Sequence, residues 1–264
     1  MNLIMIFPDE VTSNNSVQLT DERAKHIRTV LRAQPGKTLR IGLLNGPLGI
    51  GMVEKTLDES VMLSCAWEAA PPPRPAIDLL LAMPRPKVLK RLWAQFAALG
   101  VGRIILTNAE KVERFYFDTH VLDPDFYNAR LVEGLQQARD TLLPEVRIVR
   151  KLKPFIEDEL DGVFPRSGKR IIADPSGTQT VFQALVARDA PLEADCVGAQ
   201  RFAAQGQSER VMLVVGPEGG WTPAELELFK AHGFEVFGMG PRILRTDTAC
   251  IALLSQLSLC FSLE

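Results

Sequence analysis

Residues 211–254 read VMLVVGPEGGWTPAELELFKAHGFEVFGMGPRILRTDTACIALL, and this stretch decides the fold. It opens with consecutive apolar residues rich in β-branched side chains, which predict a strand buried on both faces. The strand stops at the glycine-rich segment 216–220, whose backbone can take positive φ and approach a ligand closely. Thr222, Pro223 and Glu225 then mark the start of a helix, as N-cap, first-turn proline and capping-box glutamate.

The same order of strand, loop and helix repeats at once. Residues 234–237 predict a second apolar strand, which runs into the loop GMGPRILRTDT at 238–248. A helix that is apolar around nearly its whole circumference follows from 249 to 261. Two such units in succession predict neighbouring parallel strands whose loops share one edge of a sheet. Because open α/β sheets bind ligands at their carboxyl edge, we expect the functional site in these two loops.

The preceding residues predict the rest of a parallel sheet in an α/β fold. Further strands are expected at 77–82, 103–106, 147–149 and 169–173. Residues 87–99 predict an amphipathic helix whose Trp93 and Phe96 belong to the core. Asp174 ends the last of these strands at the same edge, where it either binds a cofactor or caps its own turn. Residues 187–209 are small and polar, which is typical of a long loop or an insertion.

Residues 1–72 predict a small β-rich domain, which the proline-rich segment 71–75 separates from a domain covering 76–264. Its strands are expected at 38–44, 48–53 and 60–67. One helix is expected from Thr20, as N-cap, to Ala33. It carries a basic face made of Lys25, Arg28 and Arg32. This face is either simply solvated or contacts phosphate groups.

The composition excludes several classes of protein. The 264 residues carry a net charge of −2, and no apolar run reaches the roughly 20 residues that span a bilayer. The first residues lack the basic flank and cleavage site of a secretory signal, so we expect a cytoplasmic protein without membrane contact. The cysteines and histidines are scattered, which predicts neither a disulfide framework nor a metal site. The sequence also lacks the motifs of dinucleotide-binding folds, P-loop proteins, zinc proteases and α/β-hydrolases.

Residues 215–220 and 239–249 together closely resemble the paired signatures of the bacterial 16S ribosomal RNA uracil-N3 methyltransferases, which belong to the SPOUT class. This resemblance implies a SPOUT-type trefoil-knotted α/β methyltransferase domain, a homodimer, and S-adenosyl-L-methionine bent into the knot. It also implies a PUA-like N-terminal β-barrel that helps bind RNA, since residues 26–32 match a segment of that barrel. The chain departs from the family at 92–98, where apolar residues replace the usual lysine and glutamate, and it matches only partly at 136–146.

The resemblance further implies the residues of the site. The cofactor-binding positions are Asp174, Val215, Gly216, Pro217, Gly219, Gly220, Met239, Gly240, Ile243, Leu244 and Thr246. RNA contacts are expected from Lys25, Arg28, Arg32 and Arg242. The implied substrate is 16S ribosomal RNA in the 30S subunit, methylated at N3 of one uridine near the decoding centre, with no metal involved.

Methyl transfer to uracil N3 is an in-line displacement that requires the N3 proton to leave. Holding N3 against the methyl group can supply up to about 7–11 kcal/mol of the barrier. A positioned base, or a cation that stabilises the developing uracil anion, adds typically about 10²–10⁴-fold. We choose Arg245 as the cation, with Arg242 as the second choice, and Glu218 or Asp247 as the base. Each carboxylate also has a structural interpretation, because a helix N-terminus stabilises a nearby negative charge.

Other functions stay open at this point. A knotted methyltransferase with a different RNA target is compatible with the departures from the family between residues 84 and 141. An RNA-binding ribosome assembly factor of the same fold, without turnover, is the second alternative. An enzyme for a small molecule is disfavoured, because the separate N-terminal domain carries a basic helix. Calorimetry with S-adenosylmethionine distinguishes the enzymes from the assembly factor, which has no reason to bind the cofactor.

Overall fold

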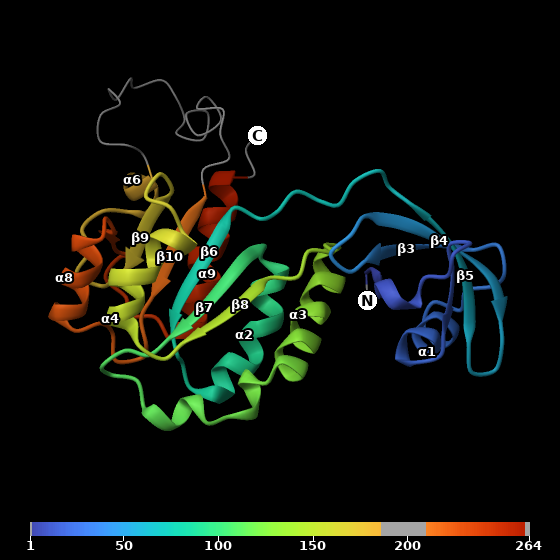
Figure 1. Cartoon of the computed structure of the whole chain (residues 1–264), viewed down its shortest axis with the longest axis horizontal. Helices are drawn as coiled ribbons and strands as arrows, with labels where there is room; N and C mark the ends of the chain where they lie inside the picture. Colours follow the sequence, from blue (N-terminus) through green and yellow to red (C-terminus); the bar gives the residue numbers. More distant parts are fainter. Residues whose placement is uncertain (1, 186–209, 262–264) are drawn as a thin grey trace, which may run out of the picture. The chain divides into compact units, whose positions relative to one another are not determined.

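The computed structural model describes residues 2–185 and 210–261, so the insertion expected at 187–209 lies outside the described residues. The chain divides into two compact units (Figure 1). The first comprises Met1–Arg74 with Asn128–Leu143, and the second comprises Pro75–Tyr127 with Pro144–Glu264. Within the described ranges, no helix is both long and apolar enough to cross a membrane.

The first unit contains a five-stranded sheet in the order β1-β3-β4-β5-β2. Its strands are β1 Ile4–Ile6, β2 Ser16–Leu19, β3 Thr38–Leu43, β4 Leu48–Thr56 and β5 Val61–Trp67. β1 pairs with β3 in parallel, and the other pairs are antiparallel. The three strands expected from the alternating pattern are confirmed. The sequence analysis missed β1 and β2, because strands of three and four residues are too short to show a period.

Helix α1 spans Glu22–Thr29 and is shorter than the helix expected from 20 to 33. Its N-cap is Asp21 and not Thr20, since the Asp21 carboxylate accepts a hydrogen bond from the Arg23 N–H at 2.9 Å. At the other end the chain leaves the helix before Arg32, which takes a positive φ of 47°. Arg32 therefore does not share a helical face with the two cations that precede it. A short 3₁₀ turn, Pro8–Glu10, lies upstream in the same unit.

Residues 128–143 belong to the first unit although they lie far from it in sequence. Thr141 is fully buried, and its hydroxyl donates a hydrogen bond to the Gly46 carbonyl at 2.6 Å. The Asn45 N–H donates in turn to the Thr141 carbonyl at 2.8 Å, and the Asn45 side chain accepts from the Leu143 N–H at 2.9 Å. These bonds join the turn between β3 and β4 to residues 141–143.

The second unit contains a six-stranded, fully parallel sheet in the order β11-β9-β10-β6-β7-β8 (Figure 1). Its strands are β6 Ile77–Ala82, β7 Val101–Thr107, β8 Glu145–Val149, β9 Lys169–Ala173, β10 Val211–Val215 and β11 Glu235–Phe237. Every residue of β6 and β10 is buried, which confirms the expectation of central strands covered on both faces. The α/β class with a parallel sheet is thereby confirmed.

The main helices are α2 Pro86–Ala98, α3 Pro124–Ala138, α6 Val181–Leu185, α8 Pro223–Ala231 and α9 Thr246–Phe261. The described residues of this unit also form short turns: the 3₁₀ turns Arg114–Phe117 and His120–Leu122, α4 Leu152–Pro154, the π-helical turn Phe155–Glu159 and α5 Leu160–Val163. Trp93 and Phe96 of α2 are fully buried, as expected of core residues. α9 packs against both α2 and β10, so it lies over the centre of the sheet.

Charged groups pair with one another at the amino edge of this sheet. The Asp78 carboxylate, near the start of β6, is fully buried and accepts a hydrogen bond from Arg210 Nη2 at 2.5 Å. Arg103, near the start of β7, lies 3.6 Å from the same carboxylate. Burial raises the pKa of Asp78, and the hydrogen bond from Arg210 opposes that rise. Since these charges satisfy one another, the ligand-binding groups are to be sought at the opposite, carboxyl edge.

Candidate functional site

Three loops meet at the carboxyl edge of the second unit, after β9, β10 and β11. The prediction from the sequence that β10 and β11 are neighbours was wrong. β9 lies between them and pairs with both, so the loop that begins at Asp174 is flanked by the two glycine-bearing loops. The sequence order of two strand–loop–helix units does not exclude the insertion of an earlier strand between them. The site is therefore built around three loops and not two.

The loops after β9 and β11 are joined through their backbones. The Asp174 N–H donates to the Phe237 carbonyl at 3.0 Å, and the Gly238 N–H donates to the Gln179 carbonyl at 2.9 Å. A Cβ on Gly177 would lie 2.2 Å from the carbonyl carbon of Phe237, and one on Gly238 would lie 2.4 Å from the Gly177 oxygen. Only glycine permits this approach at both positions. Neither glycine was among the expected site residues, although Gly177 stood in the turn already noted at this edge.

Asp174 caps its own turn. One carboxylate oxygen accepts hydrogen bonds from the Ser176 N–H at 2.9 Å and from the Ser176 hydroxyl at 2.6 Å. This is the structural interpretation considered for Asp174 from the sequence. The second carboxylate oxygen has no hydrogen bond within the described residues, so a ligand contact through that atom is compatible with the capping role.

The loop after β10 closes over an indole ring. A Cβ on Gly216 would lie 2.9 Å from Nε1 of Trp221, so glycine is required where the strand ends. Gly220 takes a positive φ of 68°, and its N–H donates to the Pro217 carbonyl at 2.8 Å. Trp221 is only 5% exposed, and its Nε1 finds no hydrogen-bond acceptor among the described residues. The next residue caps α8, and the capping box expected from the sequence is confirmed.

Two residues from the loop after β7 hold the glycine-rich loop in place. The Lys111 ammonium donates to the Gly219 carbonyl at 2.9 Å, and its aliphatic stem lies 3.1 Å from where a Gly219 Cβ would be. The Glu110 N–H donates to the carboxylate of Glu225 in α8 at 2.8 Å. The sequence analysis missed Lys111, because a single lysine after a strand carries no distinctive signal. Its position at the carboxyl edge of a parallel strand was the available clue.

The two carboxylates considered as bases differ in their surroundings. Glu218 is exposed, and its carboxylate accepts a hydrogen bond from the Arg85 N–H, at the N-terminus of α2, at 3.2 Å. Asp247 is engaged by Arg91 of α2, whose Nη2 donates at 2.8 Å, and by its neighbour Arg245 at 3.8 Å. Glu218 is therefore the more accessible of the two carboxylates.

The segment after β11 is open to solvent. The Arg245 side chain is 77% exposed, and Ile243 is 87% exposed. Gly240 takes a positive φ of 92°, which turns the chain toward α9. α9 starts at Thr246, which is buried, three residues earlier than expected.

The Cys250 thiol lies one turn into α9. Burial together with the nearby Asp247 carboxylate raises the pKa of this thiol to about 12, so the thiol is inert.

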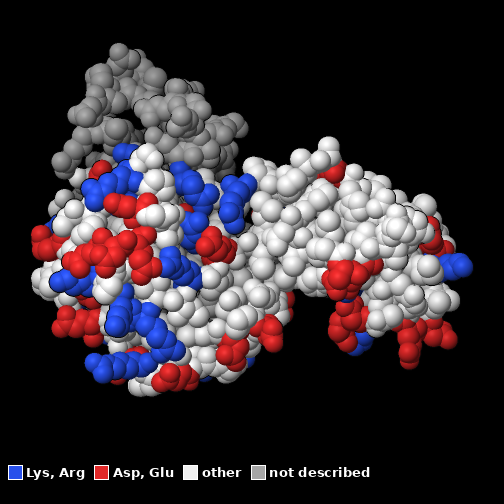
Figure 2. Space-filling view, in the orientation of Figure 1, with Lys and Arg blue, Asp and Glu red and all other residues white. Residues whose placement is uncertain are grey.

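The basic side chains expected to contact RNA fall into two groups. Lys25, Arg28 and Arg32 lie in the first unit, and Lys25 forms an exposed ion pair with Glu22 at 3.3 Å. Arg242 lies in the exposed segment of the second unit. Figure 2 shows lysine, arginine and acidic side chains interspersed over the visible face of the second unit, whereas the visible face of the first unit is mainly uncharged. Among the described residues, no group of His, Cys, Asp and Glu could hold a metal ion.

Comparison with known proteins adds independent information. Residues 71–258 match the model of the RNA methyltransferase domain family. The chain is 27% identical over 258 residues to ribosomal RNA small subunit methyltransferase E of Treponema pallidum, covering 96% of this chain and 88% of that protein. It is 25% identical over 253 residues to ribosomal RNA small subunit methyltransferase E 1 of Borreliella burgdorferi, covering 96% and 95%.

Solved structures share the fold over nearly the whole chain. The ribosomal RNA small subunit methyltransferase E of Neisseria gonorrhoeae, bound to S-adenosyl methionine, superposes with a TM-score of 0.72 at 17% identity. That match covers 98% of this chain and 97% of the other. A putative methyltransferase of Legionella pneumophila, in complex with the same cofactor, superposes with a TM-score of 0.70 at 23% identity and covers 98% of each chain.

Proposed function

Because this chain belongs to the RNA methyltransferase domain family, we propose that it methylates 16S ribosomal RNA with S-adenosyl-L-methionine as methyl donor. The named relatives act on the RNA of the small ribosomal subunit, and they align with almost the whole chain. The target atom is N3 of one uridine near the decoding centre, which the paired signatures of residues 215–220 and 239–249 support. Such a substrate implies a cytoplasmic enzyme.

The observation that carries this proposal is the set of loops at the carboxyl edge. Gly177 and Gly238 bring two loops into backbone contact, and Gly216 leaves room for the Trp221 indole, whose buried N–H has no acceptor among the described residues. A nucleoside cofactor needs backbone donors and acceptors at close range, and glycine allows that approach. The site residues fit S-adenosylmethionine. We assign them as Asp174, Val215, Gly216, Pro217, Gly219, Gly220, Met239, Gly240, Ile243, Leu244 and Thr246.

When bound, the cofactor supplies an activated methyl group on a sulfonium. The protein positions the uracil and provides the charged side chains that act on it. The loops would orient the uracil N3 toward the bound cofactor, a contribution of up to about 7–11 kcal/mol. The exposed Arg245 guanidinium stabilises negative charge that develops on the uracil as its N3 proton leaves. Glu218, exposed and oriented by the Arg85 N–H, accepts that proton.

The same family membership supports an architecture for the whole chain. We assign residues 76–264 to a SPOUT methyltransferase domain whose C-terminal loops form a trefoil knot, and residues 1–72 to a PUA-like β-barrel. RNA is bound by Lys25, Arg28 and Arg32 of the barrel and by Arg242 beside the cofactor loops. The separate compact first unit, with its five-stranded sheet, supports a distinct RNA-binding domain.

A homodimer is part of the proposal. α9 buries Leu253, Leu254 and Leu257 completely, yet Ile251 is 36% exposed and Leu259 is 63% exposed on the same helix. A second copy packing on α9 would cover these apolar side chains. Sedimentation equilibrium measures the molecular mass directly. A mass of twice 29.2 kDa is expected, and a stable monomer at micromolar concentration contradicts the assignment.

The experiment that tests the function has two arms. Titration calorimetry with S-adenosylmethionine tests cofactor binding, and transfer of tritiated methyl to 30S subunits or to free 16S RNA tests turnover. We expect saturable binding and incorporation, with mass spectrometry placing the methyl group on N3 of a uridine. Cofactor binding with incorporation at another atom or position supports a methyltransferase of different specificity. RNA binding without cofactor binding supports an assembly factor instead.

A further inference from the structure

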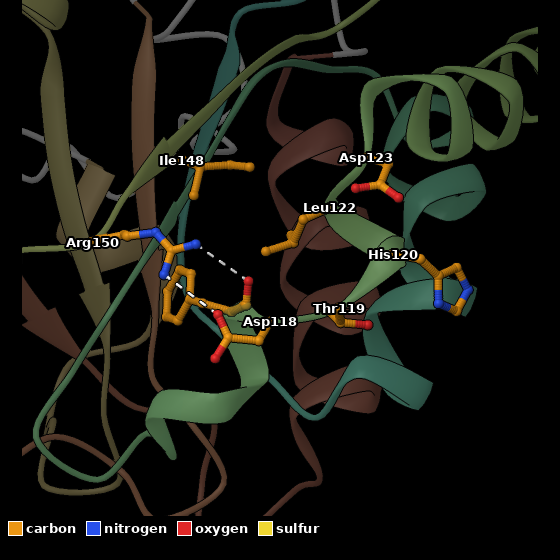
Figure 3. Close-up of a pocket in the computed structure, with 8 residues that line it drawn as sticks. Asp118, Thr119, His120, Leu122, Asp123, Ile148 and Arg150 are labelled. Atoms are coloured by element: carbon orange, nitrogen blue, oxygen red, sulfur yellow. Dashed lines mark hydrogen bonds and ion pairs between the residues drawn. The ribbon is translucent and has the colours of Figure 1, made fainter.

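A cavity lies in the second unit, away from the cofactor loops, at the carboxyl end of β8, which is the edge strand of the sheet (Figure 3). It has a volume of about 460 Å³ and is formed by the loop 117–123 and by the end of β8. The lining residues used below are Phe117, Asp118, Leu122, Asp123, Ile148 and Arg150. None of them belongs to the cofactor loops or to the groups assigned to methyl transfer.

One wall of the cavity is a guanidinium group held in a defined orientation. The Arg150 guanidinium carbon lies 5.3 Å from the centre of the Phe117 ring, and its Nη2 donates to the Phe117 carbonyl at 3.4 Å. Its Nη1 lies 3.9 Å from the Asp118 carboxylate. Despite these contacts the side chain remains 64% exposed. One face of the guanidinium thus rests on an aromatic ring, and the rest is available to a ligand.

The opposite wall is apolar, and the rim carries acceptors. Leu122 points from the loop toward Ile148 and Arg150 (Figure 3). Leu122 is 8% exposed, whereas Ile148 is 37% exposed at the cavity surface. The Asp118 and Asp123 carboxylates line the same cavity. A flat ligand that enters here would lie between Leu122 on one side and the wall made by Ile148 and the Arg150 guanidinium on the other, with carboxylate oxygens at the cavity edge.

We propose that this cavity binds an unpaired base of the substrate RNA a few nucleotides from the target uridine, a statement that rests on the proposed function. RNA-binding proteins take up unstacked bases against aromatic rings and arginine planes, and they read the edges of those bases by hydrogen bonds. The Asp118 carboxylate lies beside Arg150, and the Asp123 carboxylate also lines the cavity, so the acidic groups oppose a phosphate group and the base rather than the backbone occupies the cavity. Carboxylates accept hydrogen bonds from an exocyclic amino group. The preferred base therefore carries one, as cytosine does and uracil does not.

The position in the sheet fits a flanking nucleotide. β8 is separated from β10 by β7 and β6. With neighbouring strands roughly 4.8 Å apart, the cavity lies on the order of 15 Å from the end of β10. A few nucleotides of single-stranded RNA bridge such a distance. The loop after β7 connects the two places, since Lys111 contacts the glycine-rich loop and Phe117 lines the cavity.

The test compares three variants of the full chain. Arg150→Ala removes the stacking plane, Arg150→Lys keeps the charge without the plane, and Lys151→Ala removes the adjacent exposed cation, which does not line the cavity. Fluorescence anisotropy measures binding of labelled oligocytidine and oligouridine of equal length, and steady-state kinetics measure KM and kcat on 30S subunits. Thermal unfolding confirms that each variant is folded, and calorimetry confirms unchanged cofactor affinity.

We expect Arg150→Ala to weaken oligocytidine binding and to raise KM by roughly tenfold without lowering kcat. Arg150→Lys should resemble the alanine variant, because an ammonium offers no plane for a base, and Lys151→Ala should change binding less than about twofold. The wild type should bind oligocytidine more tightly than oligouridine. Full activity of Arg150→Lys, or equal losses in Arg150→Ala and Lys151→Ala, would overturn the proposal in favour of plain charge attraction. Equal binding of the two oligonucleotides would overturn the role of the carboxylates.

The binding arm separates this inference from the proposed function. Oligonucleotide binding requires neither the cofactor nor turnover. A wild-type protein that binds RNA with the expected Arg150 dependence but never transfers a methyl group contradicts the proposed function and supports the cavity. Methyl transfer that is indifferent to Arg150→Ala contradicts the cavity and leaves the function in place.

Discussion

Replacing Arg245 by alanine should lower kcat for methyl transfer by roughly 10²–10⁴-fold, with little change in the affinity for S-adenosylmethionine. The Arg245 side chain is 77% exposed and makes one long contact, 3.8 Å from Asp247, so its removal disturbs no buried group. The loss arises because no cation remains to stabilise charge on the uracil as its N3 proton leaves. Tritiated methyl transfer to 30S subunits measures the rate, and calorimetry measures cofactor affinity.

A matched control is available at the other edge of the sheet. Arg166 is 70% exposed and, like Arg245, pairs through Nε with a nearby aspartate, although its distance to Asp161 is shorter, at 2.8 Å against 3.8 Å. It lies just before β9, at the amino edge, so Arg166→Ala should leave turnover within about twofold of the wild type. Unchanged turnover in Arg245→Ala would remove this arginine from the mechanism. A loss confined to cofactor affinity would reassign it to cofactor binding.

The second large effect is expected from Gly177→Ala, which should weaken S-adenosylmethionine binding by about 10²-fold or more. The new Cβ would lie 2.2 Å from the carbonyl carbon of Phe237 and 2.5 Å from the Gly238 nitrogen, both of them backbone atoms. The loops after β9 and β11 must then move apart, and a displacement of about 1 Å is enough to cost two orders of magnitude. The free energy of unfolding should fall by only about 1–3 kcal/mol, so a folded protein remains to be measured.

Gly162→Ala provides the control for this substitution. A Cβ at Gly162, in α5, meets nothing within 4 Å. The same chemical change should therefore leave cofactor binding intact and slightly increase stability, by up to about 1 kcal/mol. Calorimetry of both variants, with thermal unfolding alongside, separates a local effect on the loops from a general loss of structure. Normal cofactor affinity in Gly177→Ala would show that the junction of these loops does not shape the pocket.

Much of the fold could be predicted from patterns of a few residues. The apolar segments that became β6, β9 and β10 were recognisable, although Asp78 interrupts β6 and two basic residues open β9, and the structure has all three with the expected bounds. The Thr222 capping box was confirmed because a cap needs only a hydroxyl and a carboxylate at fixed spacing. Short elements gave less signal, so β1 and β2 were missed, and α1 proved shorter than expected once Asp21 took the capping role.

Local sequence patterns predicted only part of the candidate site. The two glycine-bearing loops, Asp174, Arg245 and Glu218 were proposed as parts of the site from residue type, position after a strand, and resemblance to a family. The contacts made by Lys111 and the backbone junction of Gly177 with Gly238 were not identified. Each of these joins residues about 60 to 110 positions apart, and no local pattern encodes such a pair.

By itself, the sequence determined the longer strands and helices, the parallel character of the larger sheet, and the glycines that end its strands. These properties depend on side-chain period, capping and backbone freedom, which act over a few neighbouring residues. Only the tertiary structure decided that β9 lies between β10 and β11, that Arg91 donates a hydrogen bond to Asp247, and that a cavity forms beside Arg150. The physical reason is that strand order and long-range contacts arise from packing the whole chain into one core, where many arrangements satisfy the same local preferences.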